Sequence, residues 1–301
     1  RVVVENPTNK TRQSGGADDD WGRFLTHHGQ ERPNNRQCTD PDWLDKYQGV
    51  PWHLEERFHS DVFIGDAATA WIRSYGGEKP VFLQVGFTGP HEPWDPLPRH
   101  LDLYEGKAMP EQVRREGELD GKPPQHRARQ KFQAEVGNEA RIDITGASDE
   151  DLARMKRHYY ANITTVDEKL GEVLTALEER GWLEESLLIF CSDHGELLGD
   201  HGFHTTKGCA FFEGSVRVPL IMSWPGHFHE SRTSDALVQL IDIAPTLLEY
   251  ADVQCPIRMQ GSSLNGILQS NSISHRDYVF SEYFRDQTLS PHLRPNFEGS
   301  Y

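Results

Sequence analysis

Short apolar runs alternate with longer amphipathic stretches along the middle of this chain. The apolar runs have the length and near-continuous character of strands that are buried on both faces, and they are residues 80–88, 187–192 and 218–224. The amphipathic stretches carry apolar residues at helical spacing, and they are residues 58–72, 148–180 and 234–251. This alternation predicts an α/β domain with a mainly parallel sheet that is flanked by helices.

Local signals predict where some of these helices begin and bend. Ser148 and the acidic residues that follow it form a favourable helix N-terminus. Pro245 lies inside the last amphipathic stretch, so we expect a kink or a second helix start there.

The composition excludes several classes of protein. The 301 residues include 31 Lys and Arg against 47 Asp and Glu, a net charge of −16 that argues against nucleic-acid binding. No apolar stretch approaches the roughly 18 residues of a transmembrane segment. The four cysteines are too few and too scattered for a disulfide scaffold or a CxxC metal site.

Polar clusters follow two of the predicted strands directly. His91 comes after the run at residues 80–88, and Asp193-His194 comes after the run at residues 187–192. Binding and catalytic sites of parallel α/β sheets lie at the carboxyl ends of strands. The sequence therefore predicts a functional site at these two positions.

The segment after the second run combines metal-ligand and anion-binding chemistry. Asp193 offers an anionic oxygen and His194 a neutral nitrogen, and Gly195 permits the sharp turn that would bring both to one divalent cation. Lys207 offers a point positive charge to an oxyanion. The alternatives are a solvated acidic loop and a zinc site at His201 and His204, whose spacing is not that of HExxH.

His91 is flanked by Pro90 and Pro93, which restrict the backbone around it. A histidine held in this way can bind an oxyanion or protonate a leaving group near neutral pH. The alternative is an ordinary turn histidine.

Four blocks in the same order resemble the sulfatase family of the alkaline-phosphatase superfamily. The resemblance covers roughly residues 50 to 270. Its blocks are residues 79–94, 159–167, 192–220, and 241–248 with 260–264. It implies an alkaline-phosphatase-like fold and a sulfatase-like catalytic core.

The resemblance implies a role for each candidate residue. Asp193 and His194 match the second metal-ligand pair of the family and would hold one divalent cation, most often Ca²⁺. Lys207 matches the lysine that contacts the sulfate and the leaving-group oxygen. His91 matches the substrate-binding histidine and candidate proton donor, and His204 is expected to line the pocket.

A further pair, Glu213 and Arg217, falls within a matching block. We interpret it as a structural ion pair that supports the loop.

Two elements of the family are missing from the sequence. Sulfatases carry an early strand that ends in Asp-Asp, and a Cys-x-Pro-x-Arg or Ser-x-Pro-x-Arg motif whose first residue becomes the formylglycine nucleophile. None of the four cysteines has that spacing, and the acidic run at residues 18–20 follows Gly15-Gly16-Ala17 rather than an apolar strand. We interpret the chain as an internal fragment, with a fold that is incomplete at both ends and without activity on its own.

The expected organisation follows from this resemblance. Residues 1–50 form a polar, loop-rich segment of the catalytic domain, with a short helix near residues 18–28. Residues 51–270 form the partial catalytic core with a polar excursion at 105–147. Residues 271–301 begin a truncated C-terminal region.

The resemblance implies a sulfuric ester hydrolase that acts on a small-molecule or carbohydrate sulfate ester. One alternative is a phosphonate monoester or phosphodiester hydrolase of the same superfamily, since Asp-His metal pairs occur there. Another is a non-catalytic binding module or pseudoenzyme. Members of the family are often periplasmic, secreted or lysosomal, and the sequence does not decide among these compartments.

Overall fold

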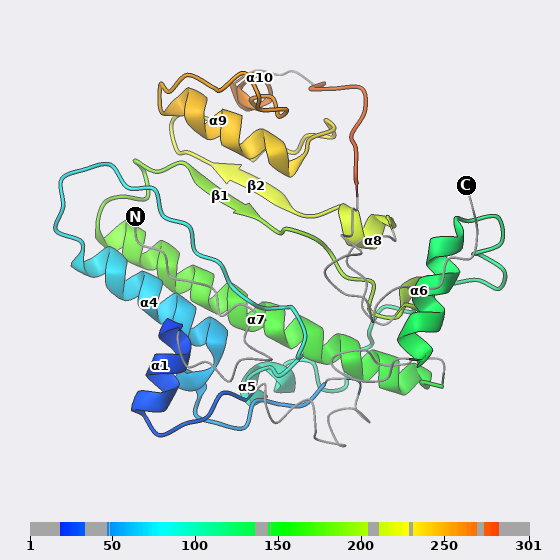
Figure 1. Ribbon diagram of the computed structural model, residues 1–301. Coiled ribbons are helices and arrows are strands. Elements are labelled where there is room, and N and C mark those ends of the chain that lie inside the picture. Colours follow the sequence, from blue (N-terminus) through cyan, green and yellow to red (C-terminus); the bar gives the residue numbers. More distant parts are fainter. Residues whose placement is uncertain are drawn as a thin grey trace. The chain divides into compact units, whose positions relative to one another are not determined.

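The computed structural model of the chain (Figure 1) describes residues 19–33, 47, 49–135, 144, 146–203, 211–228, 231–269 and 274–282. The chain divides into two compact units. The first unit comprises residues 1–183 and 197–206, and the second comprises residues 184–196 and 207–301.

The first unit is built from helices. They are α1 (Asp20–His27), α4 (Ser60–Ser74), α5 (Pro98–Asp102), α6 (Pro124–Glu135) and α7 (Asp149–Glu179), with the 3-10 turns η2 (Glu56–Phe58) and η3 (Asp200–Gly202). The predicted helices at residues 18–28, 58–72 and 148–180 are confirmed as α1, α4 and α7. Within the predicted excursion, residues 105–118 are mostly exposed, and α6 follows them.

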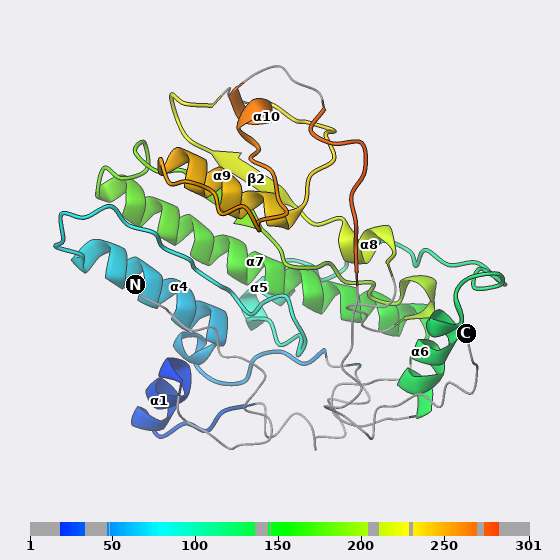
Figure 2. The ribbon, with the colours of Figure 1, turned by 45° about the horizontal axis from the view of Figure 1, so that its top comes forward.

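The long helix α7 begins where the sequence predicts. The Ser148 side chain accepts a hydrogen bond from the Asp151 backbone N–H, and the Asp151 carboxylate accepts one from the Ser148 N–H, which makes a reciprocal capping box. Helices α4 and α7 lie side by side (Figures 1 and 2). Lys169 of α7 joins them, since its Nζ lies 2.7 Å from Asp66 of α4.

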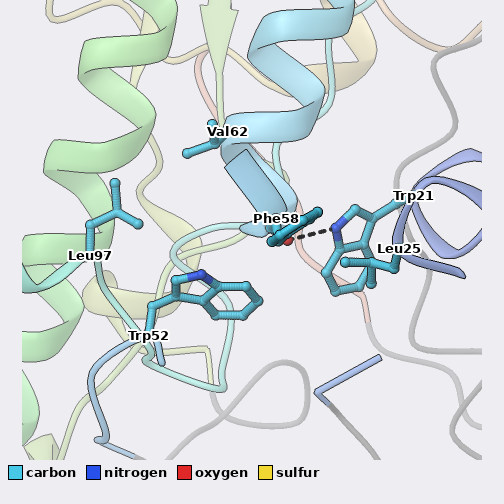
Figure 3. Close-up of a cluster of buried hydrophobic side chains, with 6 residues drawn as sticks. All are labelled: Trp21, Leu25, Trp52, Phe58, Val62 and Leu97. Atoms are coloured by element: carbon cyan, nitrogen blue, oxygen red, sulfur yellow. Dashed lines mark hydrogen bonds between the residues drawn. The ribbon is translucent and has the colours of Figure 1, made fainter. Parts of the chain in front are cut away.

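A cluster of large apolar side chains forms one core of the first unit (Figure 3). It consists of Trp21, Leu25, Trp52, Phe58, Val62 and Leu97, each at most 5% exposed. The indole N–H of Trp21 donates to the Phe58 carbonyl at 2.9 Å, so this buried polar group is satisfied. The cluster packs α1 against the start of α4, the helix that precedes the His91 turn in the chain.

The second unit contains a two-stranded sheet and short helices. Its elements are β1 (Leu188–Cys191), α8 (Glu213–Val216), β2 (Leu220–Ser223), η4 (Leu240–Asp242), α9 (Ile243–Tyr250) and α10 (Asn265–Gln269). The predicted strands at residues 187–192 and 218–224 are confirmed as β1 and β2. Helix α9 runs alongside β2 (Figures 1 and 2).

The sheet differs from the prediction in its direction and its burial. Strands β1 and β2 pair antiparallel, with Leu188 opposite Ser223 and Cys191 opposite Leu220. The mainly parallel sheet is therefore not found among the described residues, whose one sheet is this antiparallel pair. Phe190 is 40% exposed, so β1 is not buried on both faces as its apolar sequence predicts.

The run at residues 80–88, predicted to be a buried strand, has no regular secondary structure. Phe82 in this run is 73% exposed. A strand needs a neighbour to take up its backbone hydrogen bonds, and the part of the chain that the structure describes offers this run none. The apolar sequence of the run does not show whether a partner strand is present.

The last predicted helix is shorter than its apolar pattern. Residues 234–239 are not helical, and α9 begins at Ile243 after the 3-10 turn η4. Pro245 is then the third residue of the helix, where its missing N–H would have had no partner within the helix. The predicted restart is therefore confirmed, with the proline in the first helical turn.

Within the described ranges, no helix combines the length and the apolar character that crossing a bilayer requires.

Candidate functional site

The two predicted polar clusters lie in different compact units. His91 belongs to the first unit, whereas Asp193 and His194 belong to the second. Lys207 and His204, the other two predicted site residues, lie outside the residues that the structure describes.

His91 sits in a tight turn with several internal hydrogen bonds. Its backbone N–H donates to the Thr88 carbonyl at 3.1 Å. Its Nδ1 lies 2.5 Å from the Glu92 carbonyl oxygen and 3.2 Å from Glu92 Oε2. Both flanking prolines follow cis peptide bonds. The fully buried Trp94 donates from Nε1 to the Pro90 carbonyl at 3.0 Å, which anchors the turn in the interior.

The turn is also held from α4. Asp61, the second residue of that helix, is 2% exposed, and its carboxylate accepts hydrogen bonds from the Thr88 and Gly89 N–H groups at 2.7 and 3.0 Å. Sequence reasoning did not assign Asp61 to the site. The available signal was that an acidic residue interrupts the apolar stripe of a predicted helix.

A small polar pocket of about 40 Å³ lies beside His91. Trp21 and Trp52 of the apolar cluster line one part of it, and Asp61 and Asn162 line another. Asn162 is 2% exposed, and its Oδ1 has no hydrogen-bond partner within the described part of the chain. A pocket of this size has room for only a few water molecules. His91 therefore lies at a small pocket rather than in a deep cleft.

The side chains around this turn have defined charge states. Burial lowers the pKa of His59, whose Nδ1 accepts the Asp61 N–H at 3.2 Å, so this histidine is neutral near pH 7. Hydrogen bonds from Arg99 lower the pKa of Glu168 to about 2, with Arg99 bound to both carboxylate oxygens at 2.6 Å. This ion pair joins α5, which follows the His91 turn in the chain, to α7.

The Asp193–His194 turn directly follows β1. The Asp193 carboxylate accepts a hydrogen bond from the His194 N–H at 2.9 Å, and Ser192 Oγ donates one to the His194 carbonyl at 2.8 Å. The Gly195 N–H donates to the Ser215 carbonyl at 2.9 Å. A Cβ at Gly195 would lie 2.1 Å from the Gly214 carbonyl oxygen, so only glycine permits this approach to α8.

The two predicted metal ligands present their donor atoms to one side. Asp193 Oδ1 lies 3.7 Å from His194 Nε2, and the Asp193 side chain is 85% exposed. The other ring nitrogen of His194, Nδ1, lies 2.9 Å from the Gly195 carbonyl, the kind of contact that orients metal-binding histidines.

These two donors suit a shared cation. Bonds of about 2.0–2.6 Å from a carboxylate oxygen and an imidazole nitrogen to one divalent cation can span the 3.7 Å between Asp193 Oδ1 and His194 Nε2. Across the described ranges, no group of three or more His, Cys, Asp or Glu side chains gathers around a point where a metal could bind. Whether Asp193 and His194 take part in a cation site is therefore a matter for the proposal below.

Other sequence interpretations have clear outcomes. Asp19 caps α1 by accepting the Gly22 N–H at 2.6 Å, and its carboxylate pairs with Arg32. Glu213 and Arg217 approach within 4.0 Å, but both side chains are 82% exposed. An exposed pair of this kind contributes little stability, so its predicted structural role is small.

Comparisons with known proteins converge on one family. A sequence model of the family described as Sulfatase matches residues 7–253. An arylsulfatase of Clostridium perfringens is 31% identical over 236 residues, which cover 77% of this chain and 47% of that relative.

Two solved structures share the fold. BT4656, solved in complex with its substrate D-glucosamine-2-N,6-O-disulfate, matches with a TM-score of 0.62 and 24% identity over 73% of this chain and 54% of its own. The phosphonate monoester hydrolase SpPMH of Silicibacter pomeroyi matches with a TM-score of 0.65 and 21% identity over 82% of this chain and 50% of its own. At these identities the likeness shows the fold alone, which is alkaline-phosphatase-like as expected. The chain spans about half the length of the proteins that it matches.

Proposed function

Because this chain belongs to the sulfatase family, we propose that the whole protein hydrolyses a sulfate ester. The observation that carries the proposal is the family match over residues 7–253, which includes both the His91 turn and the Asp193–His194 turn. Each turn has local geometry that suits the role the resemblance implies for it.

His91 would act on the leaving group. Its Nδ1 lies against the Glu92 carbonyl and carboxylate, so Nε2 is the nitrogen that would reach the ester. As a nucleophile's oxygen bonds to sulfur, the S–O bond to the alcohol would break, and the alcohol oxygen would keep the electron pair and take the proton of the imidazolium. A positioned acid of this kind accounts for about 10²–10⁴-fold in rate.

Asp193 and His194 would hold the divalent cation, expected to be Ca²⁺. When bound, such a cation supplies positive charge beside the non-bridging oxygens of the ester. Lys207 would add a second positive charge there. The formylglycine nucleophile would lie outside these 301 residues, since no Cys-x-Pro-x-Arg or Ser-x-Pro-x-Arg motif occurs in them.

The substrate would be a small-molecule or carbohydrate sulfate ester. Support comes from BT4656, a fold relative whose own substrate is a sulfated glucosamine, and from the arylsulfatase relative. A pocket of about 40 Å³ beside His91 is too small for a sugar ring, so the substrate body would bind outside it.

A phosphonate monoester or phosphodiester hydrolase is the second candidate. The Asp193-His194 pair permits it, because the resemblance links this donor pair to such enzymes as well as to sulfatases. Sulfate and phosphate esters present similar tetrahedral oxyanions, so the residues on this chain can serve either substrate.

Parallel assays of the whole protein with Ca²⁺ separate the two candidates. We expect kcat/KM for 4-nitrophenyl sulfate to exceed that for bis(4-nitrophenyl) phosphate and for phenylphosphonate monoesters. The reverse order would assign the second candidate, and activity on none of them would contradict both.

Two variants test the residue roles in the same assay. His91→Ala and Lys207→Ala should each lower kcat/KM about 100-fold or more. His27→Ala, an exposed histidine at the end of α1, is the matched control and should leave turnover unchanged. Full turnover in both site variants would show that the assignment is wrong.

A further inference from the structure

We propose that Asp61 is a positioning residue, which sets the place of the His91 imidazole through the backbone of Thr88 and Gly89. The inference rests on the role proposed above for His91. It assigns a function to a buried carboxylate on α4 that is thirty residues away from His91 in sequence.

The contacts of Asp61 are concentrated on the turn. Its Oδ1 accepts the Thr88 N–H at 2.7 Å and the Gly89 N–H at 3.0 Å, and its Oδ2 lies 3.1 Å from the same Gly89 nitrogen. A buried carboxylate is costly unless such donors satisfy it. The position of the carboxylate and the position of these two N–H groups therefore depend on each other.

The first turn of α4 holds the carboxylate in place. Asp61 is the second residue of a 15-residue helix, where the positive end of the helix dipole favours an anion. Its own N–H donates to Nδ1 of His59, which caps the helix. Asp61 is thus fixed by a regular element, and it transmits that fixed position to an irregular turn.

Gly89 makes this contact possible. A Cβ at this position would lie 2.5 Å from Asp61 Oδ2 and 3.1 Å from a methyl of Val166. Any side chain here would push the turn away from the carboxylate. Glycine is therefore required by the close approach to Asp61.

The last link runs from the anchored turn to the imidazole. The His91 N–H donates to the Thr88 carbonyl, so the residue that carries the imidazole is bonded to the residue that Asp61 holds. A displacement of about 1 Å at a reacting group can cost about 10²-fold in rate. Loosening of the Asp61 contact is expected to act on turnover through His91.

A double-mutant cycle in the whole protein tests this inference. Asp61→Asn, His91→Ala and the double variant are assayed on 4-nitrophenyl sulfate, each below its own unfolding temperature. We expect Asp61→Asn alone to lower kcat/KM about 10–100-fold, mainly through kcat. In the His91→Ala background the same substitution should change kcat/KM less than about twofold, because its target is already gone.

The cycle separates positioning from a merely structural role. A structural role would lower activity by the same factor in both backgrounds, and that additive result would overturn the inference, as would full activity of Asp61→Asn. Unchanged activity of His91→Ala alone would instead contradict the role proposed for His91.

A second variant and a matched control complete the test. Gly89→Ala keeps the carboxylate but displaces the turn. It should lower kcat/KM by a similar factor, and this loss should also depend on His91. This variant keeps the inference testable if Asp61→Asn folds poorly. Losses from Gly89→Ala that persist in the His91→Ala background would overturn the inference. Asp66→Asn removes a carboxylate on the same helix that binds Lys169 and not the turn, and it should keep activity within about twofold.

Discussion

The His91 turn and the Asp193–His194 turn follow similar apolar runs in the sequence, but they are held in different ways. The first is anchored by the buried Asp61 of α4, which is distant in sequence, and by the buried Trp94, which lies four residues after Pro90. The second is held by its own strand and by α8, and the Asp193 carboxylate is 85% exposed. The difference is consistent with the roles proposed above, because a proton donor gains from a fixed position, whereas a cation ligand can stay exposed until its ion binds.

The largest expected effect tests whether the apolar cluster supports the first turn. Phe58 is 1% exposed in the cluster whose tryptophans line the His91 pocket, so Phe58→Ala should cost about 3–5 kcal/mol in the free energy of unfolding. Urea denaturation of the whole protein measures this cost.

The matched substitution lies on the strand pair next to the second turn. Ile221 of β2 is 60% exposed, so Ile221→Ala should change the same free energy by less than about 0.5 kcal/mol. A cost similar to that of Phe58→Ala would break the comparison, since it would mean that Ile221 is covered in the whole protein.

A smaller effect is expected from Asp193, and it concerns binding rather than folding. Asp193→Ala should weaken Ca²⁺ affinity by at least about 10–100-fold, because it removes one of the two donors that these adjacent residues are proposed to supply. The metal-free stability should stay within about 0.5 kcal/mol, because the side chain is exposed.

Calorimetric titration with Ca²⁺ and thermal unfolding in EDTA measure the two quantities for Asp193→Ala. Asp235→Ala, an exposed carboxylate in the same unit, is the control and should bind Ca²⁺ as the unchanged protein does. Equal affinity in Asp193→Ala and Asp235→Ala would contradict the proposed cation site.

The smallest effect is a pH dependence in the first unit. The Glu168 pKa of about 2 is below its unfolded value of 4.5, mainly because of the hydrogen bonds from Arg99. The stability that this ion pair contributes is therefore present above pH 4.5 and lost as the pH falls toward 2. The side chain is 35% exposed, so solvent screening keeps the effect small.

Glu168→Gln should therefore flatten the loss of stability in acid and lower stability slightly at neutral pH. Urea midpoints across this pH range provide the measurement. Glu178→Gln, an exposed residue on the same helix, should follow the unchanged protein. If Glu168→Gln leaves the loss of stability at low pH unchanged, other carboxylates cause that loss.

Sequence reasoning was most successful where the signal was local. The helix start at Ser148 was predicted because its capping partner Asp151 is three residues away. The donor types at Asp193 and His194 were also visible, and the structure brings these adjacent residues together. Asp61 was not assigned, because its partners at Thr88 and Gly89 are more than 25 residues away.

By itself, the sequence determined the positions of the main helices, the two polar turns and the membership of the chain in the sulfatase family. These features depend on residue spacing, helix caps and motifs, each of which involves residues that are close together in the sequence. Only the tertiary structure decided that β1 and β2 pair antiparallel, that residues 80–88 form no strand, and that Asp61 holds the His91 turn. The physical reason is that a strand's hydrogen bonds and a buried carboxylate's donors come from distant segments, which no local pattern specifies.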